Sequence, residues 1–500
     1  MATPIPLNHA CFSLNALLRA TRGGLRGPVL DSALEVRGVS TDSRSVGPGE
    51  LFVALHGERF DGHDHLEAVA ARGAVIALVE RDVRVPGLTV LVVESTLEAL
   101  GRLAAHHLER WRRSGKKKVV ALTGSAGKTT TKRAIAALLE AQAPGKVLVT
   151  AGNLNNLVGV PMTILSVTDA TDILVLEMGT NAPGEIAALA HMARPDVGLV
   201  TLIASAHSEG LGGLEGIAKE KTAMFRELAP GATAIGNTDD PRVSLGLAAS
   251  RAGERIAYGM GPEADYRIVR REALGIACQL LEVRRPDGSV VVFSTPLLGE
   301  AGALATVAGL AAAACASPGS PDTREVIEAA LGVLSSLEEG PGRLQARELQ
   351  SGIVVLDDSY NANPASCRAS IDTARELAAA LGRPLVLVLG EMRELGADRE
   401  SAHRSLGEWA ADSGARLLIT VGPEAERTAA RASERGQATR HADTSARAAV
   451  VATEVVESKD FVLVKGSRGV RTELVIDALA ALAAVAPSGL HGAPPSGASA

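Results

Sequence analysis

Residues 117–136, KKVVALTGSAGKTTTKRAIA, place an apolar run directly before a glycine-containing turn, a lysine and three threonines. This order predicts a strand over 119–122, a phosphate-binding turn, and a helix that opens at Lys128. The turn would direct main-chain N–H groups inward, and the helix start adds the positive end of its dipole. Leu122 stands where the full motif has its first glycine, so the loop is a shortened variant. An ordinary strand-to-helix turn with a solvated Lys128 also fits. The predicted polyphosphate site comprises Gly124, Ser125, Ala126, Gly127, Lys128, Thr129 and Thr130.

The length of 500 residues exceeds one ordinary core and suggests about three domains. Hydrophobic residues make up 46% of the chain but aromatic residues only 2%, which favours helices packed on sheets over an aromatic-rich sandwich. The net charge of -6 argues against nucleic acid as a partner. The Ala-rich window 301–316 is short enough for a buried helix, so no membrane insertion is expected.

The four cysteines, Cys11, Cys278, Cys315 and Cys367, show neither metal-site nor disulfide-framework spacing. A reducing cytoplasm is the simplest compartment for such a chain.

Three α/β domains are expected, followed by a Gly-, Pro-, Ala- and Ser-rich tail that is predicted to be disordered. The small N-terminal domain has a short strand at 51–55 between two polar loops, and helical patterns at 66–73 and 96–113. Ser43 and Arg44 in the first loop could offer donors to a phosphorylated ligand, or form a turn capped by Asp42. The expected boundaries are 1–114, 115–320, 321–486 and 487–500.

The central domain alternates apolar runs at 119–122, 147–150, 173–176 and 197–203 with helical patterns. This alternation predicts a doubly wound, mostly parallel sheet with its chemistry at the carboxyl ends of the strands. Glu177 and His207 follow two of these runs. A carboxylate there suits Mg²⁺, whereas a lone histidine is as often an ordinary hydrogen-bonding residue. The third domain, with runs at 353–356, 385–389, 417–421 and 461–464, is expected to be Rossmann-like.

Several motifs together resemble the Mur ligase family of bacterial cell-wall synthesis. They are Gly124–Thr130, Gly152-Asn-Leu-Asn-Asn156, Glu177-Met-Gly, His207, Ile217-Ala-Lys-Glu-Lys221, Asp357-Asp-Ser-Tyr-Asn-Ala-Asn-Pro364 and Lys465-Gly-Ser-Arg468. The resemblance covers nearly the whole chain and implies an ATP- and Mg²⁺-dependent ligase. The implied reaction joins D-alanyl-D-alanine to UDP-MurNAc-tripeptide through an acyl phosphate, with release of ADP and phosphate. The implied enzyme is cytoplasmic, and we expect a monomer.

The resemblance also implies roles for individual residues. Lys128 would hold the phosphates, while Thr129 and Glu177 would bind one Mg²⁺. His207 would bind a second, together with Lys221 carbamylated by CO₂; without the family, Lys221 would be read as an exposed helix lysine. The implied nucleotide contacts in the third domain are Arg343, Asp358, Tyr360 and Asn361. The implied substrate contacts are Ser43, Arg44, Asp61, Gly62, His63, Asn153, Asn155 and Asn156.

One stretch departs from the family pattern. The residues Gly299–Thr306 contain no asparagine, although the family usually contacts adenine there with a His-Asn pair and a further Asn. Two alternatives stay open at this point. A sister ligase could add another amino acid, although Thr238-Asp-Asp-Pro-Arg242 only superficially resembles the diaminopimelate-reading motif and lies in the wrong domain. A nucleotide switch would explain the phosphate loop, but not Glu177, His207 and Lys221 together.

Overall fold

The structure is a computed structural model that describes residues 3–28, 30–31, 33–57, 60–204, 208–317, 323–335 and 342–482. His207, the expected boundary near residue 320 and the tail 487–500 lie outside these ranges. The chain divides into two compact units. One comprises Met1–Glu272, Leu280–Leu297 and Ala301–Leu337, and the other Ala273–Gln279, Leu298–Glu300 and Glu338–Ala500.

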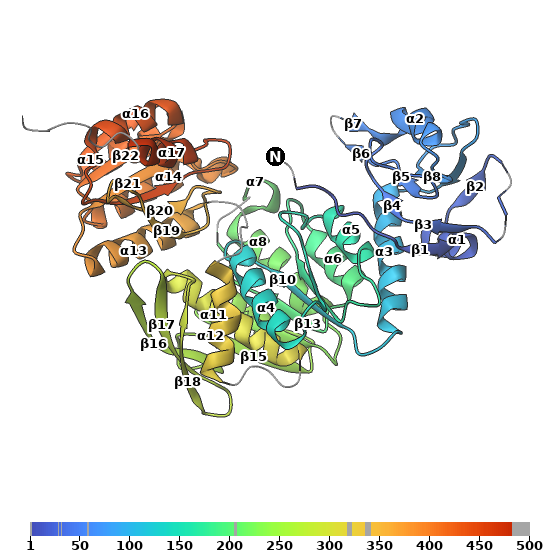
Figure 1. The fold of residues 1–500 in the computed structure, drawn as a ribbon, viewed down its shortest axis with the longest axis horizontal. Helices are drawn as coiled ribbons and strands as arrows, with labels where there is room; N and C mark the ends of the chain where they lie inside the picture. The colour runs from blue at the N-terminus through green and yellow to red at the C-terminus, as the bar shows by residue number, and fades with distance from the viewer. Residues whose placement is uncertain are drawn as a thin grey trace, which may run out of the picture. The chain divides into compact units, whose positions relative to one another are not determined.

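The N-terminal domain, blue in Figure 1, holds a five-stranded sheet in the order β2-β9-β8-β5-β4. Its strands are parallel except for β2, which pairs antiparallel with β9. The strands of the whole domain are β1 (Cys11–Ser13), β2 (Gly24–Arg26), β3 (Glu35–Arg37), β4 (Val39–Ser40), β5 (Leu51–Val53), β6 (His56–Gly57), β7 (Phe60–Asp61), β8 (Ile76–Val79) and β9 (Thr89–Val92). Its helices are α1 (Leu14–Thr21), the 3₁₀ helix η1 (Gly62–His65), α2 (Leu66–Ala71) and α3 (Thr96–Arg112). The expected strand and both expected helices of this domain are thus confirmed, with slightly shorter bounds.

The central domain has a nine-stranded sheet in the order β11-β12-β10-β13-β14-β15-β16-β17-β18. Every pairing from β11 to β16 is parallel. Its strands are β10 (Lys118–Thr123), β11 (Val147–Val149), β12 (Ile173–Glu177), β13 (Val197–Val200), β14 (Thr233–Asn237), β15 (Glu254–Gly259), β16 (Tyr266–Leu274), β17 (Cys278–Arg284) and β18 (Val290–Thr295). The helices are α4 (Lys128–Gln142), α5 (Gly159–Leu165), α6 (Glu185–Ala193), α7 (Ser208–Leu211), α8 (Gly213–Lys221), α9 (Ala223–Glu227), α10 (Pro241–Ala248), α11 (Gly299–Ala316) and α12 (Arg324–Gly332).

Strand β10 shows why its sequence reads as one continuous apolar run. Val119 and Ala121 enter one buried cluster, and Val120 and Leu122 enter another. Successive side chains of a strand point to opposite faces, so both faces of the sheet are covered and every position must be apolar. The expected doubly wound sheet is confirmed. The expected apolar run extends to Ile203, but strand β13 ends at Val200. Directly after this end, the Thr201 hydroxyl donates to Ala126 O at 2.6 Å.

Helix α11 is the one helix of the described chain that is long and apolar enough to cross a membrane by length and composition. However, 72% of this 18-residue helix is buried inside the protein. Ala303, Val307 and Ala311 are each fully buried in the core. The expectation of a buried, Ala-rich core helix is therefore confirmed.

The C-terminal domain contains a six-stranded sheet in the order β19-β20-β24-β21-β22-β23. Only the β19–β20 pair is antiparallel. The strands are β19 (Gln345–Glu348), β20 (Val354–Asp358), β21 (Leu385–Gly390), β22 (Leu417–Val421), β23 (Thr439–Ala442) and β24 (Phe461–Lys465). The helices are α13 (Pro364–Ala380), α14 (Arg399–Asp412), α15 (Glu426–Glu434), α16 (Ser445–Val455) and α17 (Glu473–Leu482). The four strands expected here are confirmed. The three α/β domains agree with the fold class expected from the sequence.

Candidate active site

The phosphate loop joins β10 to α4, in the strand–turn–helix context that its sequence predicts (Figure 1). Gly124 has φ +151°, and a Cβ built on it would lie 1.9 Å from Thr201 Oγ1. Gly127 has φ +79° and caps the start of α4. A side chain at Gly124 would therefore displace the segment after β13, and both glycines are required by the shape of the turn.

The remaining loop residues are held by the segment that follows β13. Ser125 N donates to Leu202 O at 2.8 Å, and Ser125 Oγ accepts from Ala204 N at 3.0 Å. The Lys128 ammonium donates to Gly124 O at 2.8 Å, so it lies across the mouth of its own loop. The loop thus presents a cation and a helix start in one place, which is an arrangement suited to polyphosphate.

Glu177 lies at the carboxyl end of β12, beside the phosphate loop, and is only 2% exposed. Its Oε2 accepts from the Thr129 hydroxyl at 3.0 Å, and its Oε1 accepts from Asn155 Nδ2 at 2.9 Å. The Lys132 ammonium lies 3.3 Å from Oε2. Burial alone would raise the pKa of Glu177, but the charges of Lys132 and Lys128 outweigh it and lower the pKa. The carboxylate is therefore ionised.

The loop after β11 carries the predicted asparagines, and the structure gives each a different partner. Asn155 contacts Glu177 and also accepts from Gly179 N at 2.7 Å through its main-chain oxygen. Asn156 Oδ1 accepts from Val158 N and Gly159 N and so caps the start of α5. Asn153 Oδ1 accepts from the Thr3 hydroxyl at 2.7 Å.

Lys221 ends α8 and is 4% exposed, so it is not the solvated helix lysine that its sequence position alone suggests. Burial, followed by the nearby charge of Lys128, lowers the pKa of Lys221 to about 7. The neighbouring Glu220 accepts from Gly184 N and Ile186 N, each at 2.7 Å, which anchors α8 to the start of α6.

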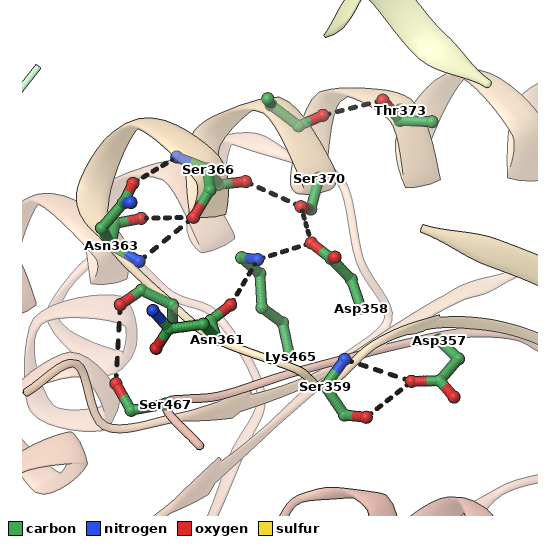
Figure 2. Close-up of polar contacts among 12 residues, drawn as sticks. Asp357, Asp358, Ser359, Asn361, Asn363, Ser366, Ser370, Thr373, Lys465 and Ser467 are labelled. Atoms are coloured by element: carbon green, nitrogen blue, oxygen red, sulfur yellow. Dashed lines mark hydrogen bonds and ion pairs between the residues drawn. The ribbon is translucent and has the colours of Figure 1, made fainter. Parts of the chain in front are cut away.

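In the C-terminal domain, Asp358 and the loop that follows β20 form a second cluster (Figure 2). Figure 2 shows the Lys465 ammonium between the Asp358 carboxylate and Asn361 O, to which it donates at 2.9 Å. Ser370 also donates to Asp358. The guanidinium of Arg343 lies over the Tyr360 ring, 3.9 Å from its centroid, and that of Arg468 lies 5.5 Å from it. All four predicted nucleotide contacts of this domain therefore lie in one cluster.

The predicted substrate residues of the N-terminal domain occupy two polar turns. Arg44 donates to both oxygens of Asp42, at 2.9 and 2.7 Å, and this contact lowers the pKa of Asp42 to about 2. Ser43 lies between them in the same turn and is half-buried. The Arg44 side chain itself is 86% exposed and accessible to a ligand.

The second turn holds Asp61, Gly62 and His63. Asp61 Oδ1 accepts from His63 N and from His63 Nδ1, and the first of these contacts contributes most to lowering the pKa of Asp61 to about 2. Because His63 Nε2 accepts from Glu80 N at 3.0 Å, the ring proton is on Nδ1. Gly62 packs closely, since a Cβ there would lie 2.9 Å from Ala54 Cα.

The structure therefore joins Lys128, Thr129, Glu177 and Asn155 in one site. Sequence reasoning assigned no role to Lys132, Glu220, Lys465 or Arg468, although these residues contact or adjoin the predicted ones. The sequence could have predicted that Lys132 lies near the site, because Lys132 is one helical turn beyond Lys128 and so shares a face of the helix with it. Lys465 and Arg468 stand out in the sequence only as the ends of the motif Lys465-Gly-Ser-Arg468, without a role for either side chain.

A phosphate loop on a doubly wound sheet, with an ionised carboxylate at the end of the neighbouring strand, defines a nucleotide-binding enzyme of three α/β domains. Family models for the Mur ligase catalytic domain, the Mur ligase middle domain and the Mur ligase glutamate ligase domain match residues 35–108, 122–314 and 342–468. The chain belongs to the Mur ligase family.

Relatives support this assignment over nearly the full length. UDP-N-acetylmuramoyl-tripeptide–D-alanyl-D-alanine ligase of Escherichia coli is 37% identical over 459 residues, which are 91% of this chain and 96% of the relative. The enzyme of the same name from Bacillus subtilis is 34% identical, over 77% of this chain and 80% of the relative. A crystal structure of MurF from Acinetobacter baumannii superposes with a TM-score of 0.81 at 29% identity, covering 96% of this chain and 100% of that one. MurF ligase from Thermotoga maritima, solved in complex with ADP, gives a TM-score of 0.76 at 28% identity, covering 89% and 97%.

Proposed function

We propose that this protein is an ATP-dependent ligase that adds D-alanyl-D-alanine to UDP-MurNAc-tripeptide in peptidoglycan precursor synthesis, with release of ADP and phosphate. The relatives that share its length carry this activity in their names. The observation that carries the proposal in the structure is the contact of Thr129 and Asn155 with one ionised carboxylate, Glu177. This contact brings the phosphate loop and the Asn-rich loop to the same point.

The reaction needs an electrophile, because a carboxylate resists attack by an amine. The γ-phosphate of ATP is transferred to the peptide carboxylate, and the amine of the dipeptide then displaces phosphate from the acyl phosphate through a tetrahedral intermediate. Negative charge accumulates on oxygen in both steps. Lys128 and the amides of Gly124–Thr130 would stabilise it on the phosphates, because fixed donors in a site without free water interact strongly.

The residues at Glu177 fit Mg²⁺. The Thr129 hydroxyl and the Glu177 carboxylate supply oxygen ligands, which this hard cation prefers, and the carboxylate is held ionised. In the described part of the chain no three His, Cys, Asp or Glu side chains gather to hold a metal by themselves. When bound, Mg²⁺ would neutralise charge on the phosphates.

For the second metal site, the proposal includes His207 and a carbamylated Lys221. The support is that Lys221 is buried near Lys128 and Glu177, whose charges both act on it. Carbamylation joins the neutral amine to CO₂ with loss of a proton, and it converts the lysine into an oxygen ligand. Burial favours that neutral amine.

The other residues are assigned to the substrates. Arg343, Asp358, Tyr360 and Asn361 would bind the ribose and phosphates of the nucleotide. The exposed Arg44, with Ser43, would bind the UDP end of the donor, as would the turn formed by Asp61, Gly62 and His63. Asn153, Asn155 and Asn156 would bind its sugar and peptide portion. The tight packing of Gly62 and His63 supports a role in shaping the turn around the ligand.

We further propose a cytoplasmic monomer with domains at 1–114, 115–320 and 321–486, without a nucleic-acid partner or membrane insertion. The net charge of -6 and four unpaired cysteines support this part. Limited proteolysis and sedimentation of the purified protein would test the boundaries and the oligomeric state.

A phosphate-release assay tests the reaction. Purified protein is given ATP, Mg²⁺, UDP-MurNAc-tripeptide and one acceptor at a time: D-alanyl-D-alanine, single amino acids or diaminopimelate. Release that requires both the UDP-sugar peptide and D-alanyl-D-alanine is expected. Phosphate release that requires a different acceptor would assign the protein to a sister ligase. Phosphate release at the same rate without the UDP-sugar peptide and without any acceptor would exclude a ligase.

A further inference from the structure

Lys132 is an unusual residue for the second turn of a helix, because its side chain is 1% exposed and so has no access to bulk water. A lysine is rarely buried to this extent without partners for its charge. Its ammonium donates to Thr150 O at 2.8 Å and to Gly152 O at 3.4 Å, and it lies 3.3 Å from Glu177 Oε2. The ammonium thus has two hydrogen-bonded carbonyl oxygens and one ion-paired carboxylate as partners.

The three partners belong to two parts of the site. Thr150 and Gly152 begin the loop that carries Asn153, Asn155 and Asn156. Glu177 is the carboxylate beside the phosphate loop, and its other oxygen accepts from Asn155. The Asn-rich loop is therefore connected to Glu177 at both ends. One connection is the Asn155 amide, and the other end is held by the Lys132 ammonium and by the Thr150 hydroxyl, which accepts from Glu177 N at 3.0 Å.

We infer that Lys132 is a positioning residue, which fixes the Asn-rich loop 150–156 relative to Glu177 and thereby aligns the UDP-sugar peptide with the phosphates of ATP. The inference rests on the proposed function, because it assigns loop 150–156 to that substrate. Because its side chain is 1% exposed, Lys132 would act through the loop and not by contact with a reactant. Small misplacements of a reacting group cost up to about a hundredfold in rate, so a fixed loop matters for the transfer step.

A buried lysine elsewhere in the central domain provides a matched control. The Lys117 ammonium donates to Asp169 O at 2.9 Å and to Thr171 O at 2.6 Å, and lies 2.9 Å from Asp172 Oδ1. It therefore has the same partners, two carbonyls and one carboxylate. Lys117 precedes β10, at the end of the strand opposite to the phosphate loop. Loss of either ammonium should destabilise the fold, but only one of them adjoins the site.

The experiment compares Lys132→Met and Lys117→Met with the wild type. Calorimetry measures the dissociation constants of UDP-MurNAc-tripeptide and of ADP without Mg²⁺ in the absence of turnover, and phosphate release gives KM and kcat. Mg²⁺ is left out of the ADP titration because Lys132 lies against Glu177, the proposed Mg²⁺ ligand. We expect Lys132→Met to weaken binding of the UDP-sugar peptide by at least about tenfold, as changes to supporting contacts commonly do. Its affinity for ADP without Mg²⁺ should change much less, and Lys117→Met should bind both ligands as the wild type does.

Three results would overturn the inference. The first is that Lys132→Met binds the UDP-sugar peptide with wild-type affinity. The second is that Lys132→Met and Lys117→Met lose affinity to the same extent, for the UDP-sugar peptide and for ADP alike. If Lys132→Met does not fold, Lys132→Arg replaces it, because a planar guanidinium keeps the charge but not the three-way arrangement. Wild-type affinity in Lys132→Arg is the third. A wild-type protein that binds no UDP-sugar peptide would instead refute the proposed function, and the inference with it.

Discussion

The Thr129 hydroxyl donates to Glu177 Oε2 at 3.0 Å, although 48 positions separate the two residues in the chain. Thr129 lies in the first turn of α4 and Glu177 ends β12. Strands β10 and β12 are parallel neighbours, so the turn after one lies beside the end of the other. This pairing of strands brings the start of α4 and a buried carboxylate together.

Lys128→Ala should reduce turnover by at least about a thousandfold, because the variant loses the charge that we propose stabilises the phosphates of ATP. The phosphate-release assay with both substrates measures the effect. Lys146→Ala is the control, since that exposed lysine follows the same helix outside the site. Turnover of Lys128→Ala within a few-fold of the control would remove this lysine from the mechanism.

Lys221→Ala should be inactive and then regain part of its activity with formate or acetate. A small carboxylate can occupy the space left by the lysine and supply the oxygen ligand that the carbamate would provide. Activity against carboxylate concentration is the measurement, with Lys219→Ala as the neighbouring control on α8. Full activity of Lys221→Ala without any added carboxylate would refute the carbamylation proposal.

Lys465→Met should destabilise the C-terminal domain by about 3 kcal/mol, because it leaves the Asp358 carboxylate without its buried cation. Urea unfolding measures this difference. Lys459→Met removes an exposed pair with Glu457 and should change the free energy of unfolding by no more than about 1 kcal/mol. Equal effects in the two variants would show that Lys465 is not important for the cluster.

His403 predicts a pH dependence of stability in the C-terminal domain. Burial lowers the pKa of His403, and its ring contacts Thr428 and Met392 N. Between the lowered pKa and the ordinary value near 6.5, the unfolded chain binds more protons than the folded one, so stability falls as pH drops below 6.5. The slope should reach at most about 1.4 kcal/mol per pH unit.

The variant His403→Gln isolates this effect from other titrating groups. Urea unfolding of both proteins is measured between pH 5 and pH 8. The wild type is expected to lose stability relative to the variant as the pH falls, because its unfolding takes up at most about one additional proton per molecule at His403. A constant difference across this range would show that His403 has the same proton affinity in both states.

Much of the fold was predictable because its signals are local. Apolar runs such as Leu417–Val421 coincide with strand β22, and the loop sequence around Gly124 determines its strand, turn and helix. The strands between 233 and 295 were not anticipated. Strand β16 reads as polar and charged, and its consecutive residues Val269 and Arg270, which point to opposite faces, are both exposed. No alternation of apolar and polar residues marks this strand, and its assignment depends on pairing with other strands, which begins at Tyr266 against β15.

By itself, the sequence determined that a phosphate loop opens a helix, that Glu177 follows an apolar strand, and that both occur in a chain with Mur ligase motifs. Only the tertiary structure decided which side chains meet. Lys221 is a helix lysine that the sequence without the family places in solvent, and Lys132 receives no role from the sequence, yet both are buried, Lys132 beside Glu177 and Lys221 near Lys128. Burial and contact between residues distant in sequence depend on how strands order in a sheet, and no short window of sequence contains that information.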